Sequence, residues 1–276
     1  MIGQTNLLKL IEEQIEFEDF PRFSIIVGAE GSGKKTITLS IAYALNCQRV
    51  FIEPKVDSIR EMIKNCYSVN TPTMYVIFDS DKMSQQAKNA MLKVCEETPD
   101  NAYIVMLVND IETVLPTIKS RASIYYMEPY TPEELLEYAS VTDEKQKDII
   151  MDLCETPGDV EKLRFTGIYE FYDFVEKVVD NIAEVSDANA LKIAGQIDFK
   201  DNDAQKYDMV LFLRAFKSVC GKRMKKAVAE DDMEMQLYYS AGIKIVTKAL
   251  RQMQITGINK SALFDMFILD IRREWC

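Results

Sequence analysis

A glycine-rich segment near the start of the chain has the residue types and spacing of a loop that binds phosphate groups. It reads Gly28-Ala29-Glu30-Gly31-Ser32-Gly33-Lys34-Lys35-Thr36, follows the apolar run 23–27 and opens a stretch with helical spacing. Glycines let the backbone curl so that its N–H groups face phosphate oxygens, and Lys34 at the helix start can reach the terminal phosphates. A plain glycine-rich turn is the alternative, which the flanking segments disfavour. The predicted nucleotide-binding residues here are Gly28, Gly31, Ser32, Gly33, Lys34, Lys35 and Thr36.

The metal side of this predicted site departs from the usual pattern. The residue after the lysine is normally Ser or Thr, whose hydroxyl binds Mg²⁺, whereas this chain has Lys35 there. Thr36 stands one residue later, and one helical step turns a side chain by about 100° around the axis. Thr36 is therefore not an automatic substitute for the missing hydroxyl.

A later apolar run ends in acidic residues that would complete such a site. Segment 75–78 is followed by Asp79, Ser80 and Asp81. If Asp79 is the metal ligand, the neighbouring catalytic glutamate has become Ser80; if Asp79 holds the catalytic position, the metal ligand has become Phe78. Neither register has an adjacent pair of acids, so positioning Mg²⁺ and polarising water would both suffer. We expect ATP to bind weakly or without hydrolysis, and the sequence leaves the role of Mg²⁺ open.

The composition excludes several other kinds of site and protein. The 276 residues include no histidine, and the six cysteines form no Cys-x-x-Cys pair, so we predict no zinc or other metal site built from these residues and no Ser-His-Asp or Cys-His nucleophile. A net charge of −11 argues against a freestanding DNA-binding protein, because a basic surface is what attracts phosphates. No run approaches the roughly 18 apolar residues of a membrane span, and the N-terminus lacks a signal segment. We predict a cytoplasmic protein with no membrane contact.

The pattern of apolar residues divides the chain into an α/β part and a helical part. Up to about residue 130, short β-rich runs alternate with amphipathic stretches, which is typical of a parallel sheet covered by helices. After Thr131-Pro132-Glu133-Glu134, a good helix start, the strand signal disappears. We expect strands at 23–28, 74–79, 102–108 and 123–127, helices at 34–45, 56–66 and 84–97, and domains at 1–131, 132–181 and 182–276.

Several segments together resemble the clamp-loader branch of the AAA+ ATPases. Asp81-Lys82-Met83, the run 87–93 and Glu96-Glu97-Thr98-Pro99 are similar to the stretch after the second acidic motif of that family. The segment 115–122, which ends in Ser120-Arg121-Ala122, is similar to the family's Leu-Leu-Pro-Thr-Ile-Arg-Ser-Arg-Cys. The delta-prime subunits of bacterial DNA polymerase III resemble the chain most closely. The resemblance covers nearly the whole chain and implies a P-loop AAA+ domain, a small helical lid domain and a C-terminal all-helical collar domain.

The resemblance implies roles for individual residues. Arg121 matches the arginine that in this family reaches across a subunit boundary to a neighbour's nucleotide, where a guanidinium stabilises charge on the transferred phosphoryl group. A surface ion pair is the alternative for Arg121. Asn109 falls at the family's sensor 1 position near the γ-phosphate, and an ungapped match favours the register with Phe78 at the metal position and Asp79 at the catalytic one. The zinc module of many relatives is missing.

The leading hypothesis is a subunit that helps load a sliding clamp onto primed DNA, in a hetero-oligomer with gamma/tau- and delta-type subunits. Its own hydrolysis of ATP is expected to be degenerate, while its arginine acts in trans. The alternatives are an active gamma/tau-type ATPase and a P-loop small-molecule kinase. A basic group is interpreted as a solvated helix face or a subunit contact rather than a surface that follows phosphates, and consists of Lys217, Lys222, Arg223, Lys225 and Lys226.

Overall fold

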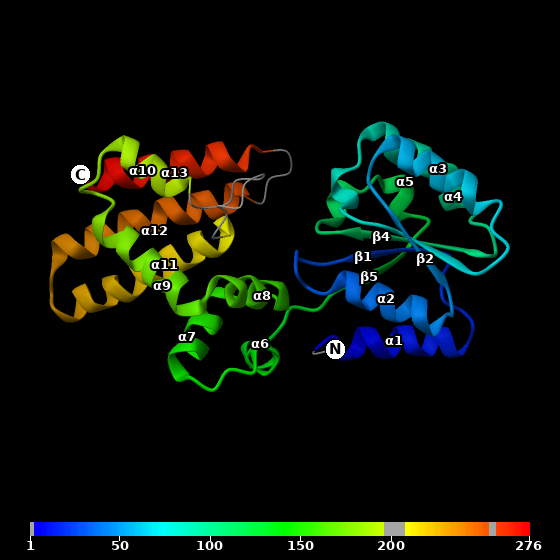
Figure 1. The fold of residues 1–276 in the computed structure, drawn as a ribbon, viewed down its shortest axis with the longest axis horizontal. Helices are drawn as coiled ribbons and strands as arrows, with labels where there is room; N and C mark the ends of the chain where they lie inside the picture. The colour runs from blue at the N-terminus through cyan, green and yellow to red at the C-terminus, as the bar shows by residue number, and fades with distance from the viewer. Residues whose placement is uncertain (1–2, 196–207, 254–257) are drawn as a thin grey trace. The chain divides into compact units, whose positions relative to one another are not determined.

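The computed structural model describes residues 3–195, 208–253 and 258–276 of the chain (Figure 1). By its internal contacts the chain divides into two compact units, Met1–Glu134 and Leu135–Cys276. Within the described ranges, no helix has both the length and the apolar character needed to cross a membrane. The finer division into three domains stays a prediction.

The first unit is built on a parallel sheet with the strand order β2-β3-β4-β1-β5. Strands β1 and β3 are buried along their whole length, because helices cover both faces of the sheet (Figure 1) and apolar side chains are therefore favoured on both. The predicted α/β class with a parallel sheet is confirmed. The strands are β1 (Phe23–Val27), β2 (Gln48–Ile52), β3 (Thr73–Ile77), β4 (Ala102–Val108) and β5 (Ser123–Tyr126).

Two layers of helices cover this sheet. Helices α3 and α4 pack on one face with buried side chains such as Ile59 and Met91, while α1 and α2 pack on the other with Ile11 and Ile37 (Figure 1). Each layer removes an apolar face of the sheet from water, which is the main favourable term in the folding of such a unit. The helical segments of this unit are α1 (Thr5–Glu16), α2 (Lys34–Ala44), α3 (Val56–Cys66), the 3₁₀ turn η1 (Ser80–Lys82), α4 (Gln85–Glu96), the 3₁₀ turn η2 (Ile111–Thr113) and α5 (Pro116–Lys119).

The first helix and the edge strand of the first unit were not predicted from the sequence, and neither were the short segments η1, η2 and α5. Strand β2 lies at the edge of the sheet and exposes four of its five residues, so it lacks the apolar run that marks β1 and β3. Helix α1 starts after Gln4, which has a left-handed backbone and makes no side-chain cap. Its N-cap position is therefore not one of the usual Ser, Thr, Asp or Asn residues.

The second unit is helical throughout its described residues. Helix α6 begins as predicted, because Thr131 and Glu134 exchange hydrogen bonds between their side chains and backbone N–H groups at 3.2 and 2.8 Å. A similar capping box between Thr156 and Asp159 starts α8. The helices are α6 (Pro132–Ala139), α7 (Glu144–Leu153), α8 (Pro157–Thr166), α9 (Ile168–Asn181), α10 (Asp187–Ala194), α11 (Met209–Ala229), α12 (Met233–Met253) and α13 (Lys260–Trp275).

The single tryptophan of the chain closes the core between α11, α12 and α13. The Trp275 ring stacks on Tyr238 at 4.3 Å and on Phe216 at 5.5 Å between centroids, and its indole N–H donates to the carbonyl of Tyr238 at 2.9 Å. Gly242 on α12 faces this ring so closely that a Cβ there would lie 2.4 Å from the Trp275 Cζ2 atom. The glycine is therefore needed for the approach of α12 to α13.

Replacing this glycine tests the packing. We expect Gly242→Ala to lower the free energy of unfolding by about 1–3 kcal/mol, because the added methyl group overpacks the core. The matched control is Gly221→Ala on α11, where an added Cβ meets nothing within 4 Å. This control should raise stability by about 0.5–1 kcal/mol through helix propensity alone. Urea unfolding followed by Trp275 fluorescence measures both, and equal effects of the two variants would contradict the packing argument.

Candidate nucleotide-binding site

The glycines of the phosphate loop are required by its backbone path. Gly31 and Gly33 have φ angles of 79° and 91°, which L side chains rarely adopt. A Cβ on Gly28 would lie 2.6 Å from the Cγ of Met127 and 2.9 Å from the hydroxyl of Ser32. The loop between β1 and α2 therefore keeps a close curl that side chains would disrupt.

The loop fits a phosphate group. The Ser32 hydroxyl oxygen is buried and has no hydrogen-bond partner within the described part of the chain. Immediately after the loop, α2 begins at Lys34, so the N–H groups of its first turn lack partners inside the helix. Such groups and the helix dipole attract anions. A phosphate ligand would supply the acceptor that the Ser32 hydroxyl lacks and would lie next to the helix N-terminus.

The ammonium of Lys34 lies at the mouth of the loop. It donates hydrogen bonds to the carbonyls of Gly28 and Ala29 at 2.7 and 2.8 Å and to the Oδ1 atom of Asn109 at 2.8 Å. Burial lowers the pKa of Lys34, while the nearby carboxylates Asp81, Glu30 and Asp79 act in the opposite direction. The structure thus brings the predicted loop lysine and the predicted sensor asparagine into contact.

Asp81 holds the asparagine in place, a role that sequence reasoning missed. Its carboxylate accepts the backbone N–H of Asn109 at 2.8 and 3.0 Å, that of Asp110 at 3.2 Å and the hydroxyl of Thr113 at 3.0 Å. Asp81 therefore connects the segment after β3 to the segment after β4. The only sequence signal was the Asp81-Lys82-Met83 motif, which carries no information about this partner.

These elements enclose a cavity of about 310 Å³ at the carboxyl ends of the strands. Asp79 lines it from the left-handed position that starts η1, and its carboxylate accepts from Lys82 at 2.7 Å. Thr36 is exposed on α2 and is not one of the described lining residues, so its role stays a prediction. The lining consists of Glu30, Gly31, Ser32, Gly33, Lys34, Lys35, Phe78, Asp79, Leu107 and Asn109.

The metal side of the cavity is occupied by an aromatic pair and a lysine. The rings of Phe51 and Phe78 lie 5.1 Å apart, and the Lys35 ammonium lies 5.4 and 5.2 Å from their centroids. Mg²⁺ requires oxygen ligands in an octahedral arrangement, and neither ring carbons nor an ammonium supply them. The residues present do not fit a magnesium ion.

Arg121 is separate from this cavity. It follows α5, and its guanidinium donates to the carboxylate of Glu96 on α4 at 2.7 Å and to the carbonyl of Thr117 at 2.8 Å. The Arg121 side chain keeps 35% of its surface exposed. The surface ion pair considered as an alternative does form, and the guanidinium stays accessible beside it.

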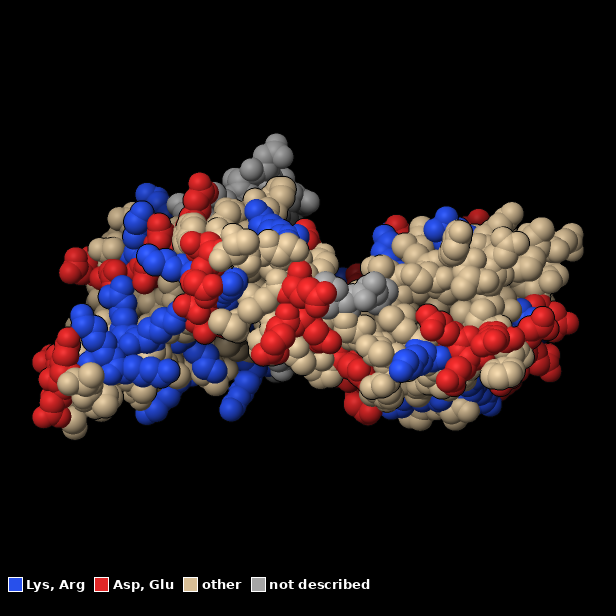
Figure 2. Space-filling view, turned by 90° about the horizontal axis from the view of Figure 1, so that it is seen from below, with Lys and Arg blue, Asp and Glu red and all other residues tan. Residues whose placement is uncertain are grey.

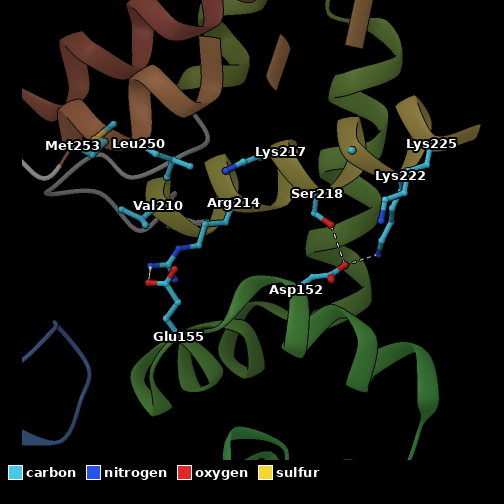
Figure 3. Close-up of a pocket in the computed structure, with 11 residues that line it drawn as sticks. Asp152, Glu155, Val210, Arg214, Lys217, Ser218, Lys222, Lys225, Leu250 and Met253 are labelled. Carbon is cyan, nitrogen blue, oxygen red and sulfur yellow. Dashed lines mark hydrogen bonds and ion pairs between the residues drawn. The ribbon is translucent and has the colours of Figure 1, made fainter. Parts of the chain in front are cut away.

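A larger cavity of about 540 Å³ in the second unit contains part of the basic group of α11. Figure 2 shows Lys and Arg side chains interleaved with acidic ones over this unit. In Figure 3, Lys222 pairs with Asp152, and Arg214 pairs with Glu155. Three of the five members of the basic group have ion pairs, and the partners are Asp152, Asp180 and Glu230. This pairing favours the interpretation as a solvated helix face or a subunit contact over a surface that follows phosphates.

Known proteins share sequence and fold with this chain. Residues 52–131 match the family model of the DNA polymerase III delta subunit. The chain is 26% identical over 169 residues to DNA polymerase III subunit gamma of Buchnera aphidicola, covering 50% of this chain and 47% of the relative. It is 26% identical over 149 residues to replication factor C subunit 3 of Schizosaccharomyces pombe, covering 49% and 43%. It therefore spans about half the length of these relatives.

Solved structures show the fold. A gamma subunit-related protein of DNA polymerase III from Thermotoga maritima superposes with a TM-score of 0.57 at 16% identity, covering 96% of this chain and 99% of that one. The RuvB branch migration motor of the same organism gives a TM-score of 0.50 at 16% identity, covering 82% and 76%. At this level of identity the likeness to solved structures shows the fold. The chain thus has a P-loop AAA+ fold with a parallel sheet, followed by a helical C-terminal region.

The Asp81 carboxylate gives a test of how the site is held. We expect Asp81→Asn to destabilise the loop after β4 by about 1–3 kcal/mol, because a charged acceptor of several hydrogen bonds is lost. Hydrogen exchange at the amides of Asn109 and Asp110 should become faster. The control is Asp79→Asn, whose ion pair with Lys82 is exposed and contributes about 0–1 kcal/mol. Unchanged exchange in Asp81→Asn would contradict the assigned role.

Proposed function

We propose that the chain is a clamp-loader subunit of the delta-prime type, which works within a DNA polymerase III assembly to place a sliding clamp on primed DNA. Its partners would be subunits of the gamma/tau and delta types, and DNA contact would occur through the complex. The observation that carries the proposal is the metal side of the cavity, where Lys35 and Phe78 replace both expected magnesium ligands. A loop that cannot hold the metal supports a subunit without its own ATP hydrolysis.

Arg121 would supply the contribution to catalysis. Its guanidinium lies apart from the cavity of its own chain and stays partly exposed, which supports a role on a phosphate of another molecule. The hydrogen bond to Glu96 orients the guanidinium without covering it. A guanidinium supplied in trans stabilises the charge that develops on the transferred phosphoryl group. The proposal therefore includes Arg121 as the arginine that acts on a neighbouring subunit's nucleotide.

An active ATPase of the gamma/tau type is the second candidate. Lys34, Asn109 and Asp79 all line the cavity, which is the arrangement that a working site also needs. The two candidates differ in one measurement, the Mg²⁺-dependent hydrolysis of ATP by the purified chain alone. A measurable Mg²⁺-dependent turnover of ATP by the chain alone would favour the active type and remove the delta-prime proposal.

The arginine is tested in the reconstituted complex. We expect Arg121→Ala to lower clamp- and DNA-stimulated ATP hydrolysis several-fold, since such an arginine contributes about 10³–10⁵ in rate at the single site that it serves. Glu96→Gln removes the ion pair and keeps the guanidinium, so it should retain nearly full hydrolysis. Arg60→Ala, which removes an exposed arginine beside Asp57, is the control for loss of surface charge.

The three variants separate a role in trans from a structural one. If Glu96→Gln lowers hydrolysis as much as Arg121→Ala, the ion pair itself is what matters, and the trans role of Arg121 is wrong. If neither variant changes hydrolysis, the neighbouring site does not use this chain. Circular dichroism and a thermal melt of each variant would show whether the first unit remains folded.

A further inference from the structure

The two residues that replace the expected magnesium ligands meet in space. Lys35 takes the place of the hydroxyl residue on α2, and in the register that the resemblance favours, Phe78 takes the place of the metal-binding acid that follows β3. The Lys35 ammonium lies over the Phe78 ring, and Phe51 of the edge strand completes the aromatic pair. A positive charge carried by the protein thus lies where a dication would otherwise be bound.

We propose that this cavity binds a nucleoside triphosphate without a magnesium ion, with the Lys35 ammonium providing the positive charge in its place. This inference deepens the proposed function and rests on it, because both require that the loop binds a nucleotide. The ligand class is a metal-free triphosphate held as a structural ligand.

Lys34 and Lys35 reach the cavity from two sides. They are the first two residues of α2, and successive helical residues point in directions about 100° apart. The Lys34 ammonium bonds to the loop and to Asn109, while the Lys35 ammonium lies against the aromatic pair. Within the part of the chain that the structure describes, Lys35 has no hydrogen-bond acceptor or acidic partner. Attraction to a ring face leaves the N–H donors of its ammonium available to phosphate oxygens.

Three carboxylates lie near Lys34, namely Asp79, Asp81 and Glu30, and the first two accept hydrogen bonds from other residues. Asp79 accepts a hydrogen bond from Lys82 at 2.7 Å. Both oxygens of Asp81 accept hydrogen bonds from the segment 109–113. In this cavity a dication would meet the Lys35 ammonium and the Phe78 ring as well as Glu30 and Asp79, and Coulomb repulsion from Lys35 would weaken its binding.

A metal-free triphosphate would be held and not hydrolysed. Mg²⁺ normally orients the phosphates and neutralises the charge that develops on them. The described residues of the cavity include no adjacent pair of acids that would hold the ion and activate water. The ligand would instead connect the loop after β1 to Asn109 after β4 and to Phe78 after β3. Free ATP carries more negative charge than its magnesium complex, so Mg²⁺ in solution would compete with Lys35 for the same phosphate oxygens.

Calorimetric titration of the full chain with ATP, in excess EDTA and in excess Mg²⁺, tests this inference. We expect the dissociation constant in EDTA to be equal to or smaller than that in Mg²⁺. Lys35→Met, which keeps the length of the side chain and removes its charge, should weaken binding in EDTA by at least about tenfold, since hydrogen bonds to charged groups contribute on that scale. Lys9→Met, on the exposed side of α1, is the control and should bind as the unchanged chain does.

A reciprocal variant restores the expected metal ligands. Lys35→Thr combined with Phe78→Asp should bind ATP at least about tenfold more tightly in Mg²⁺ than in EDTA. Binding by the unchanged chain only in Mg²⁺, unaltered binding by Lys35→Met, or no binding of ATP in either buffer would each overturn the inference. None of these results bears on the proposed action of Arg121 on a neighbour. That proposal is tested by ATP hydrolysis in the complex, so the two proposals can fail independently.

Discussion

The contact between the Lys34 ammonium and the Asn109 side chain is the point on which the arrangement of the cavity depends. It connects the loop that follows β1 with the residue that follows β4, at 2.8 Å. Asp81, after β3, holds the backbone of Asn109 in position. Parallel strands place their carboxyl ends at one edge of the sheet, so residues far apart in the sequence converge there. The parallel topology is therefore the condition for any site at this edge.

Charge then decides which ligand this edge suits. Two lysines and a helix N-terminus favour an anion, while the acids close by are engaged by Lys82 and by the segment 109–113. An ordinary magnesium-dependent site has a loop lysine and a helix N-terminus as well, and adds oxygen ligands that bind the dication. The aromatic pair of Phe51 and Phe78 contributes to this difference, because ring faces attract a cation and coordinate no metal. The cavity keeps the features that attract phosphate and lacks those that hold the metal.

Arg121 belongs to a different part of the first unit. It follows α5 and pairs with Glu96 at the end of α4, whereas the cavity lies where β1, β3 and β4 end. The Arg121 side chain is held by an ion pair and stays partly exposed, so its guanidinium is oriented before any partner binds and loses little further conformational entropy on binding. A metal-deficient cavity and an oriented surface arginine would both suit the proposed role of assisting a neighbouring ATPase.

The sequence by itself determined the parallel α/β part, the helical remainder and the phosphate loop, because glycines, apolar runs and helix starts act through neighbours along the chain. It missed α1, whose N-cap side chain makes no hydrogen bond, and it missed β2, which has no buried face. It also showed that Lys35 and Phe78 depart from the usual pattern of magnesium ligands, but it did not show that these two departures are connected. Only the tertiary structure decided that they meet and that Asp81 holds Asn109. Such contacts join different strands and helices, whose separation along the chain carries no signal of their proximity in space.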